Sequence, residues 1–177
     1  MKISNVFIDF QIFLEEGTSI FNVVAKCLVY IEELSEPIKV GEASLYIFNP
    51  QKSSFLDTCI EGNCISADLN TLFISLQDIC EIDDIPGMVA ACNDLSIKEE
   101  WRENGLGQGF LEKIKKQLSY LNVQLLLVKL STFISSSSIE NSKDDLTINN
   151  SFYECKNGEQ VIVTYRYLND RNIVLVK

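Results

Sequence analysis

The chain has 177 residues, about the length of one domain, and carries a formal net charge of −10 because 25 Asp and Glu outnumber 15 Lys and Arg. This acidic balance disfavours binding to nucleic-acid backbones and anionic membranes, both of which require a basic surface. The chain has no histidine, which excludes Ser-His-Asp and Cys-His catalysis and zinc sites with His ligands.

The first half of the chain predicts three strands and then a helix. Runs rich in β-branched and aromatic residues predict strands over residues 5–14, 23–31 and 40–48. Because the connections between them are short, the three strands are expected to form an antiparallel meander. Over residues 65–79 the apolar side chains recur every three or four positions, which predicts a helix capped by Ser66.

The second half predicts strands and helices in alternation. Residues 88–97 predict a fourth strand, and an apolar stripe over residues 106–121 predicts the strongest helix of the chain. The almost continuous apolar run at residues 123–130 predicts a strand buried on both faces. Residues 131–151, rich in Ser, Asn and Asp, predict a long polar loop. The last elements predicted are a short helix and a closing pair of strands, at residues 148–155, 159–168 and 172–176.

This order of elements predicts one domain over residues 1–177, of the α/β or α+β class. The six cysteines include no C-x-x-C pair, so free thiols are expected rather than a metal site or a disulfide framework. No signal peptide is evident, and no apolar run approaches the ~18 residues of a membrane span. The sequence therefore predicts a cytoplasmic protein that does not enter the membrane.

The junction between the fourth strand and the long helix is the segment that predicts chemistry. Three of the eight glycines lie there at alternate positions, Gly105, Gly107 and Gly109. Glycine lets a ligand approach the backbone, and the first turn of a helix offers unpaired N–H groups at the positive end of its dipole. Together these features predict an anion site, for which phosphate is the usual occupant.

The spacing of these glycines distinguishes between phosphate-binding motifs. A dinucleotide fingerprint is excluded because Phe110 stands three residues after Gly107, and no G-K-[ST] P-loop is present. The segment R-x-x-G-x-G at residues 102–107, preceded by the strand pattern Leu95-x-Ile97, resembles motif A of the GNAT family of N-acetyltransferases. The alternative is a glycine-rich helix entrance without a ligand.

The resemblance implies a fold and an activity. It implies a single GNAT-like domain whose central sheet is mixed, mostly antiparallel, of about seven strands and flanked by helices. The activity implied is transfer of an acetyl group from acetyl-coenzyme A, as co-substrate and without a metal, to a primary amine. The acidic surface favours a cationic amine as the acceptor. We expect the loop at residues 131–151 to border the acceptor site.

The resemblance also implies which residues bind the coenzyme. The backbone of the fourth strand would pair with the pantetheine arm, loop amides would surround the pyrophosphate, and Arg102 would add positive charge. The residues so implied are Leu95, Ser96, Ile97, Arg102, Glu103, Asn104, Gly105, Leu106, Gly107, Gln108 and Asn149.

The catalytic residues are predicted from weaker signals. Phe152-Tyr153-Glu154 is similar to the last helix of the family, which makes Tyr153 a candidate general acid, with a packing tyrosine as the alternative. The residues that follow depart from the family pattern because its Gly-Phe is absent. The general base would be Asp94, Glu42 or an ordered water, and each carboxylate could instead be a solvated surface charge.

Two other functions remain open from the sequence. One is a degenerate member of the family that binds acyl-coenzyme A or a protein without turnover. The other is an interaction protein of the same fold that pairs through an edge strand, as a homodimer. The expected partners of the leading hypothesis are coenzyme A and an amine.

Overall fold

One mixed sheet organises the chain in the computed structural model, which describes residues 3–32, 34–79, 85, 87–102, 105–129, 150–154 and 160–165. The strands are β1 (Ile3–Leu14), β2 (Phe21–Ile31), β3 (Ile38–Phe48), β4 (Met88–Ile97), β5 (Val123–Lys129), β6 (Asn150–Glu154) and β7 (Gln160–Tyr165). The helices are α1 (Phe55–Ile65), α2 (Ala67–Ile79) and α3 (Leu106–Tyr120), with a 3-10 turn η2 (Glu99–Trp101) after β4.

The sheet has seven strands in the order β1-β2-β3-β4-β5-β7-β6. Strands β1 to β3 form the predicted antiparallel meander, and β4, which follows α1 and α2, pairs antiparallel with β3. Strands β4 and β5 are parallel, and β7 pairs antiparallel with both β5 and β6. The parallel pair requires a crossover, and α3 provides it between β4 and β5. The predicted α/β class, with a mixed and mostly antiparallel sheet flanked by helices, is confirmed.

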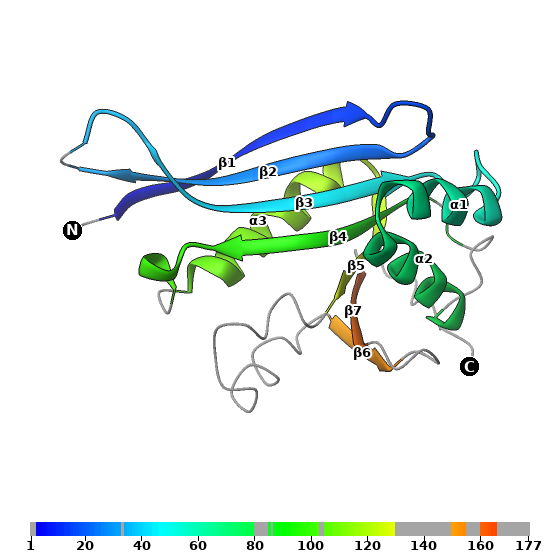
Figure 1. The fold of residues 1–177 in the computed structure, drawn as a ribbon. Helices are drawn as coiled ribbons and strands as arrows, with labels where there is room; N and C mark the ends of the chain where they lie inside the picture. The colour runs from blue at the N-terminus through cyan, green and yellow to red at the C-terminus, as the bar shows by residue number, and fades with distance from the viewer. Residues whose placement is uncertain are drawn as a thin grey trace.

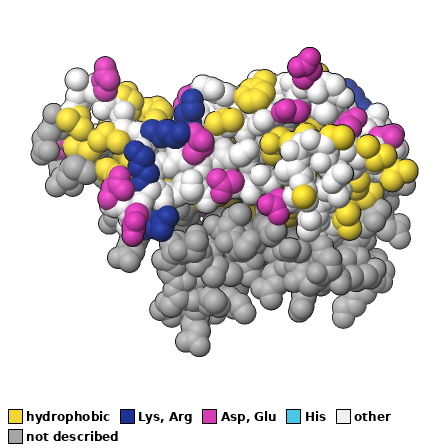
Figure 2. Space-filling view, in the orientation of Figure 1, with side chains coloured by type: hydrophobic (Ala, Val, Ile, Leu, Met, Phe, Trp, Pro, Cys, Tyr) yellow, Lys and Arg dark blue, Asp and Glu magenta, His cyan; other side chains and the backbone are white. Residues whose placement is uncertain are grey.

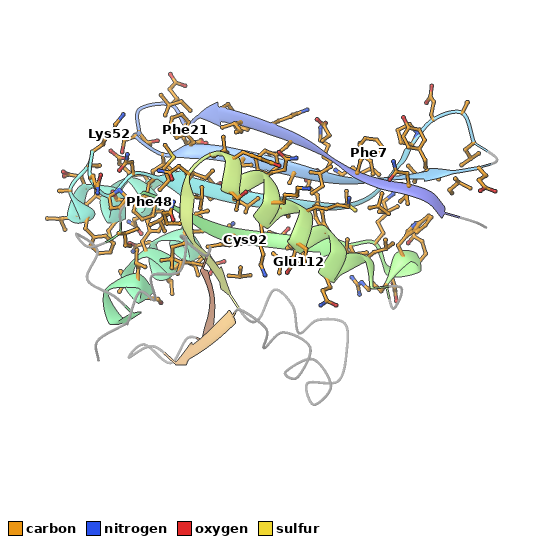
Figure 3. The ribbon with its side chains drawn as sticks, turned by 180° about the vertical axis from the view of Figure 1, so that it is seen from behind. Phe7, Phe21, Phe48, Lys52, Cys92 and Glu112 are labelled. Atoms are coloured by element: carbon orange, nitrogen blue, oxygen red, sulfur yellow. The ribbon has the colours of Figure 1, made fainter. Side chains whose placement is uncertain are left out.

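Helices cover the two faces of the sheet separately (Figure 1). The apolar stripe of α3, including Phe110, Ile114 and Leu118, packs on one face against residues of β2 such as Val23 and Ala25. Figure 3 views this face, with α3 lying across the strands. The opposite face is covered by α2, whose apolar residues Leu69, Leu72, Phe73 and Leu76 pack on Phe48, Val89 and Leu127.

The helix predicted over residues 65–79 is the second of two consecutive helices. Helix α1 was not predicted, and its N-cap is Ser54, whose Oγ accepts a hydrogen bond from the Asp57 N–H at 3.1 Å. Ser66 is extended between the helices, and its Oγ accepts from the Leu69 N–H at 3.0 Å. The periodicity of α1 is masked because Leu56 and Ile60 are exposed on its outer side. Figure 2 shows apolar side chains gathered over α1 and α2.

The C-terminal predictions are corrected in part. The helix predicted over residues 148–155 is wrong, because residues 150–154 form β6. Their pairing with β7, whose Val161-Ile162-Val163 is a strong strand former, determines the extended conformation. The strand predicted at residues 159–168 is confirmed over residues 160–165 as β7, and its remaining residues lie outside the described ones. Residues 131–149 of the predicted loop and the strand at 172–176 lie outside the described residues, and Asn150 and Ser151 belong to β6.

Candidate functional site

Strands β4 and β5 separate partway along their length. Strand β4 pairs with β3 as far as Ile97, but its pairing with β5 ends at Cys92, opposite Val128. Figure 1 shows the two strands diverging from this point. Among the described residues of β5, none pairs with β4 after Cys92, and we call the side of residues 93–97 that has no described strand beside it the open edge.

The backbone groups that face this open edge can be assigned from two hydrogen bonds. The Lys98 N–H donates to the Val40 carbonyl of β3 at 2.8 Å. Since alternate residues of a strand face the same neighbour, Ser96 also faces β3, whereas Leu95 and Ile97 face the open side. Consistent with this, the Ile97 carbonyl accepts from Arg102 Nε at 2.9 Å instead of from β3. The N–H groups of Leu95 and Ile97 therefore point to the edge that β5 leaves.

A β-bulge in β4 marks the point of divergence. The register between β3 and β4 shifts between Ser44 and Leu45, which leaves Asn93 without a cross-strand partner. Because of this extra residue, Cys92 and Leu95 are both buried on the α3 side, and Asp94 is exposed on the side of α1 and α2. The α1–α2 junction reaches the bulge, where Ser66 Oγ donates to Asn93 Oδ1 at 3.5 Å.

The first turn of α3 lies beside the end of β4. Gly105 is the N-cap, with φ 67° and ψ 5°, a left-handed conformation that favours glycine, and no side chain caps the helix. The Gly109 N–H donates to the Gly105 carbonyl at 3.0 Å and begins the helical ladder. The N–H groups of Leu106, Gly107 and Gln108 precede that bond, and the first turn carries no acidic residue. These three donors suit an anion.

The described residues leave space around the glycines of this turn. A Cβ built on Gly107 would meet Ile97 Cγ1 at 3.8 Å, an ordinary contact, and a Cβ on Gly109 would meet no described atom within 4 Å. Packing within the described chain therefore does not require glycine at either position, although glycine in a helix costs about 1 kcal/mol relative to alanine. A group that approaches the first-turn N–H groups from outside would require glycine at 107, whereas Gly109 lies about 200° further around the helix. We call the first turn of α3, with Gly105, Gly107 and the three N–H groups that precede the helical ladder, the glycine cradle.

Arg102 connects the open edge to the glycine cradle. It ends η2, where its N–H donates to the Glu99 carbonyl at 3.1 Å, and its side chain is half-buried with Nε on the Ile97 carbonyl. The guanidinium thus fastens the turn to the end of β4, three residues before Gly105. Glu103, Asn104 and Asn149, predicted to bind the coenzyme, lie outside the described residues.

The two candidate carboxylates differ in their surroundings. Glu42 lies on β3 opposite Ser96, and its carboxylate forms an ion pair with Lys39. Asp94 lies opposite Ser44 and forms no ion pair with a described residue. Because no described cation pairs with its carboxylate, Asp94 is the more available of the two to accept a proton.

The thiol nearest the point of divergence is not suited to be a nucleophile. Cys92 is fully buried on β4 beneath α3 (Figure 3), and burial, helped by the nearby Asp94 carboxylate, raises its pKa to about 12. Its Sγ donates to the Asp94 carbonyl at 3.4 Å. Cys92 stays protonated at neutral pH, which disfavours an acyl-cysteine route. Within the described residues, no group of His, Cys, Asp or Glu could hold a metal ion.

Burial also determines which cysteines react with an alkylating reagent. Cys64 is exposed, whereas Cys27 and Cys92 are buried, and burial raises the pKa of Cys27 to about 11. Iodoacetamide at neutral pH is expected to label Cys64 in the native protein and Cys27 and Cys92 only after denaturation, because the thiolate is the reactive form. Peptide mass spectrometry checks this pattern. Labelling of native Cys92 as fast as Cys64 would contradict the burial of the β4 thiol.

Tyr153 lies on β6, away from the diverging strands. It pairs with Val161 of β7, which in turn pairs with Lys129 at the end of β5. Its backbone is therefore two strand spacings from β5, roughly 10 Å. The helical setting that the resemblance implied for Tyr153 is wrong, and its role as a general acid stays a prediction.

Comparison with known proteins finds no matching family model and no matching curated protein. Among solved structures, the chain is similar to N-acetyltransferases. Arylalkylamine N-acetyltransferase 2 from Aedes aegypti matches 79% of this chain and 72% of its own, with 11% sequence identity and a TM-score of 0.48. Polyamine N-acetyltransferase from Drosophila melanogaster matches 83% of this chain and 74% of its own, with 17% identity and a TM-score of 0.45. These similarities concern the path of the chain and do not identify the residues of a site.

Proposed function

We propose that this chain is an N-acetyltransferase of the GNAT type that uses acetyl-coenzyme A to acetylate a primary amine. One observation carries the proposal: an open strand edge and an open glycine cradle adjoin each other, with a Cβ at Gly107 only 3.8 Å from Ile97 Cγ1. Coenzyme A has a matching pair of parts, an amide-bearing arm that can pair with a strand and a pyrophosphate that suits a helix N-terminus.

Each part of the coenzyme has its own protein groups in this proposal. The N–H groups of Leu95 and Ile97 pair with the pantetheine arm along the open edge, while Ser96 between them faces β3. The amides from Glu103 to Gln108 surround the pyrophosphate, and Arg102 adds positive charge beside them. These local dipoles must outweigh a net charge of −10, and they can do so because distant charges are screened by salt.

Bound acetyl-coenzyme A supplies a thioester whose acyl carbon exchanges its C–S bond for a C–N bond to the amine, releasing the thiol. The Leu95 N–H, which faces the open edge, stabilises the negative charge that develops on the carbonyl oxygen. Asp94 accepts the proton that the amine loses, and Tyr153 donates a proton to the departing sulfur. The transfer is direct, because the buried and protonated Cys92 does not serve as an intermediate carrier.

The acceptor is proposed to be a cationic amine that enters from the side of α1 and α2. Asp94 and Ser96 are exposed on that side, and the net charge of −10 attracts cations. The predicted loop, now limited to residues 131–149, is proposed to border the same entrance within a single domain. The expected acceptors are polyamines, aminoglycosides or Lys-rich peptides.

Turnover with a panel of these amines tests the proposal. Mass spectrometry is expected to detect acetylated amine and free coenzyme A in equal amounts, well beyond the molar amount of protein. Binding of acetyl-coenzyme A without product from any amine would favour the degenerate binder over the enzyme. If the chain neither binds the coenzyme nor forms product at millimolar coenzyme, the proposal is contradicted.

Substitution of the two carboxylates tests the general base. Asp94→Asn is expected to lower kcat/KM about 100-fold without changing coenzyme affinity, because only proton transfer from the amine is lost. Glu42→Gln is the matched control and is expected to change kcat/KM less than about tenfold, since Glu42 already pairs with Lys39. The opposite ranking would assign the base to Glu42, and an equally small effect of both would indicate an ordered water.

A further inference from the structure

We propose that two copies of the chain pair through β1, so that one continuous sheet crosses a homodimer. β1 is the first strand in the sheet order and has β2 as its only described neighbour. It has twelve residues, with no Pro or Gly and with Asp9 as its only charged residue, and its one irregularity lies at its start, between Ile3 and Asn5. Soluble proteins normally protect such an edge with Lys, Pro, bulges or short length, because an exposed regular edge binds another strand.

Apolar side chains of β1 remain exposed on both faces of the sheet. Towards α3, Ile12 and Leu14 are 43% and 58% exposed, and on the other face Phe13 is 47% exposed. By contrast, Val23, opposite Ile12 on β2, is fully buried. Figure 2 shows apolar side chains along the border of the molecule where β1 lies. A strand placed beside β1 would cover this surface.

The sequence of β1 is complementary to itself in one antiparallel register, with a twofold axis at Phe10. The axis stands perpendicular to the sheet, so both copies keep their α3 face on the same side. Ile8 then faces Ile12 of the second copy, and Phe7 faces Phe13. Asp9 faces Gln11 of the second copy, an amide that can donate to it, as Gln11 Nε2 already does within the chain at 3.1 Å. Every apolar residue from Val6 to Leu14 meets an apolar one.

Neighbouring registers lack this match. Moving the axis to Asp9 places two carboxylates opposite each other, and moving it to Gln11 places Asp9 opposite Phe13. A shift of one residue turns the second copy over, so that its α3 face lies on the opposite side of the shared sheet. Asp9 then lies opposite an even-numbered residue of the second copy, and every even-numbered residue from Val6 to Leu14 is apolar. The pairing at Phe10 also uses the same edge of both copies, so it closes at a dimer.

Sedimentation velocity or light scattering over a concentration series tests the dimer. The unmodified chain is expected to be a dimer at about 100 μM. Ile12→Lys places a charge opposite Ile8 of the second copy and is expected to raise the dimer dissociation constant at least about tenfold. Ile74→Lys is the matched control, because Ile74 on α2 is the same residue type with 44% exposure. A monomeric unmodified chain, or equal effects of the two variants, would overturn the proposal.

The register is tested separately by charge at Gln11, which is exposed. Gln11→Glu faces Asp9 of the second copy and is expected to weaken the dimer, whereas Gln11→Lys is expected to maintain or strengthen it. The difference should diminish at high salt. Equal dissociation constants for both variants, or the reverse ranking, would overturn the register centred on Phe10. These measurements need no coenzyme, so their outcome is independent of the proposed activity.

Discussion

Gly107→Leu is expected to abolish binding of coenzyme A while leaving the free protein folded. The added Cβ would have Ile97 Cγ1 at 3.8 Å as its one neighbour within 4 Å among the described residues, so the described packing tolerates the substitution, while the larger side chain crowds the first turn. It would displace the pyrophosphate from the first-turn amides. Loss of two charge-assisted hydrogen bonds, each worth ~1.5–3 kcal/mol, weakens binding by at least about 100-fold. The free protein should be slightly more stable, because Leu favours helix over Gly.

The loss of coenzyme binding and the change in stability of the free protein are separated by measuring the melting temperature with and without acetyl-coenzyme A. For Gly107→Leu, the melting temperature of the free protein should not fall, and the increase caused by the coenzyme should disappear. Lys116→Leu adds an apolar side chain at an exposed site on the same helix, beyond the first turn, and should retain the full increase. An undiminished increase in Gly107→Leu would show that the coenzyme does not occupy the glycine cradle.

Leu95→Pro is expected to reduce kcat several hundredfold relative to Leu95→Ala. Both substitutions remove a buried side chain, but only proline also removes the N–H that faces the open edge. Removal of one such donor to a developing oxyanion costs roughly 10²–10³ in kcat. Since Leu95 N–H does not bond to β3, its loss leaves the β3–β4 ladder intact, which keeps the proline variant comparable with the alanine variant.

Steady-state kinetics measures the difference in kcat between the two variants, and circular dichroism checks that both are folded. Both variants should be folded and less stable than the unmodified chain by about 2–4 kcal/mol, the usual cost of truncating a buried Leu. Equal kcat values for the two variants would remove Leu95 N–H from the mechanism. A proline variant that unfolds while the alanine variant folds would show that this N–H faces β3 after all.

The elements with a strong local pattern were predictable from the sequence. The run rich in strand-forming residues at 23–31 predicted β2, in which the alternate residues Val23, Ala25 and Cys27 are fully buried. The stripe of Phe110, Ile114 and Leu118 likewise predicted α3, because the buried side chains of a surface helix recur at its own period. The glycine cradle was predictable for a related reason, since alternate glycines at a strand-to-helix junction are locally unfavourable without a ligand.

Features that depend on distant partners were not predictable. The open edge of β4 arises where β5 separates from it after Cys92, and no local pattern encodes that separation. The bulge at Asn93, which exposes Asp94 on the side of α1 and α2, depends on the register with β3. The strand at Tyr153 was predicted as a helix because it becomes extended only by pairing with Val161.

Calorimetric titration with acetyl-coenzyme A tests most directly whether the open edge and the glycine cradle together hold this co-substrate. The account predicts saturable binding of one coenzyme per chain, with a dissociation constant in the micromolar range, about −7 to −8 kcal/mol. It also predicts no saturable binding to Gly107→Leu at the same concentrations. Absence of binding to the unmodified chain at millimolar coenzyme, or equal affinity for both proteins, would contradict it.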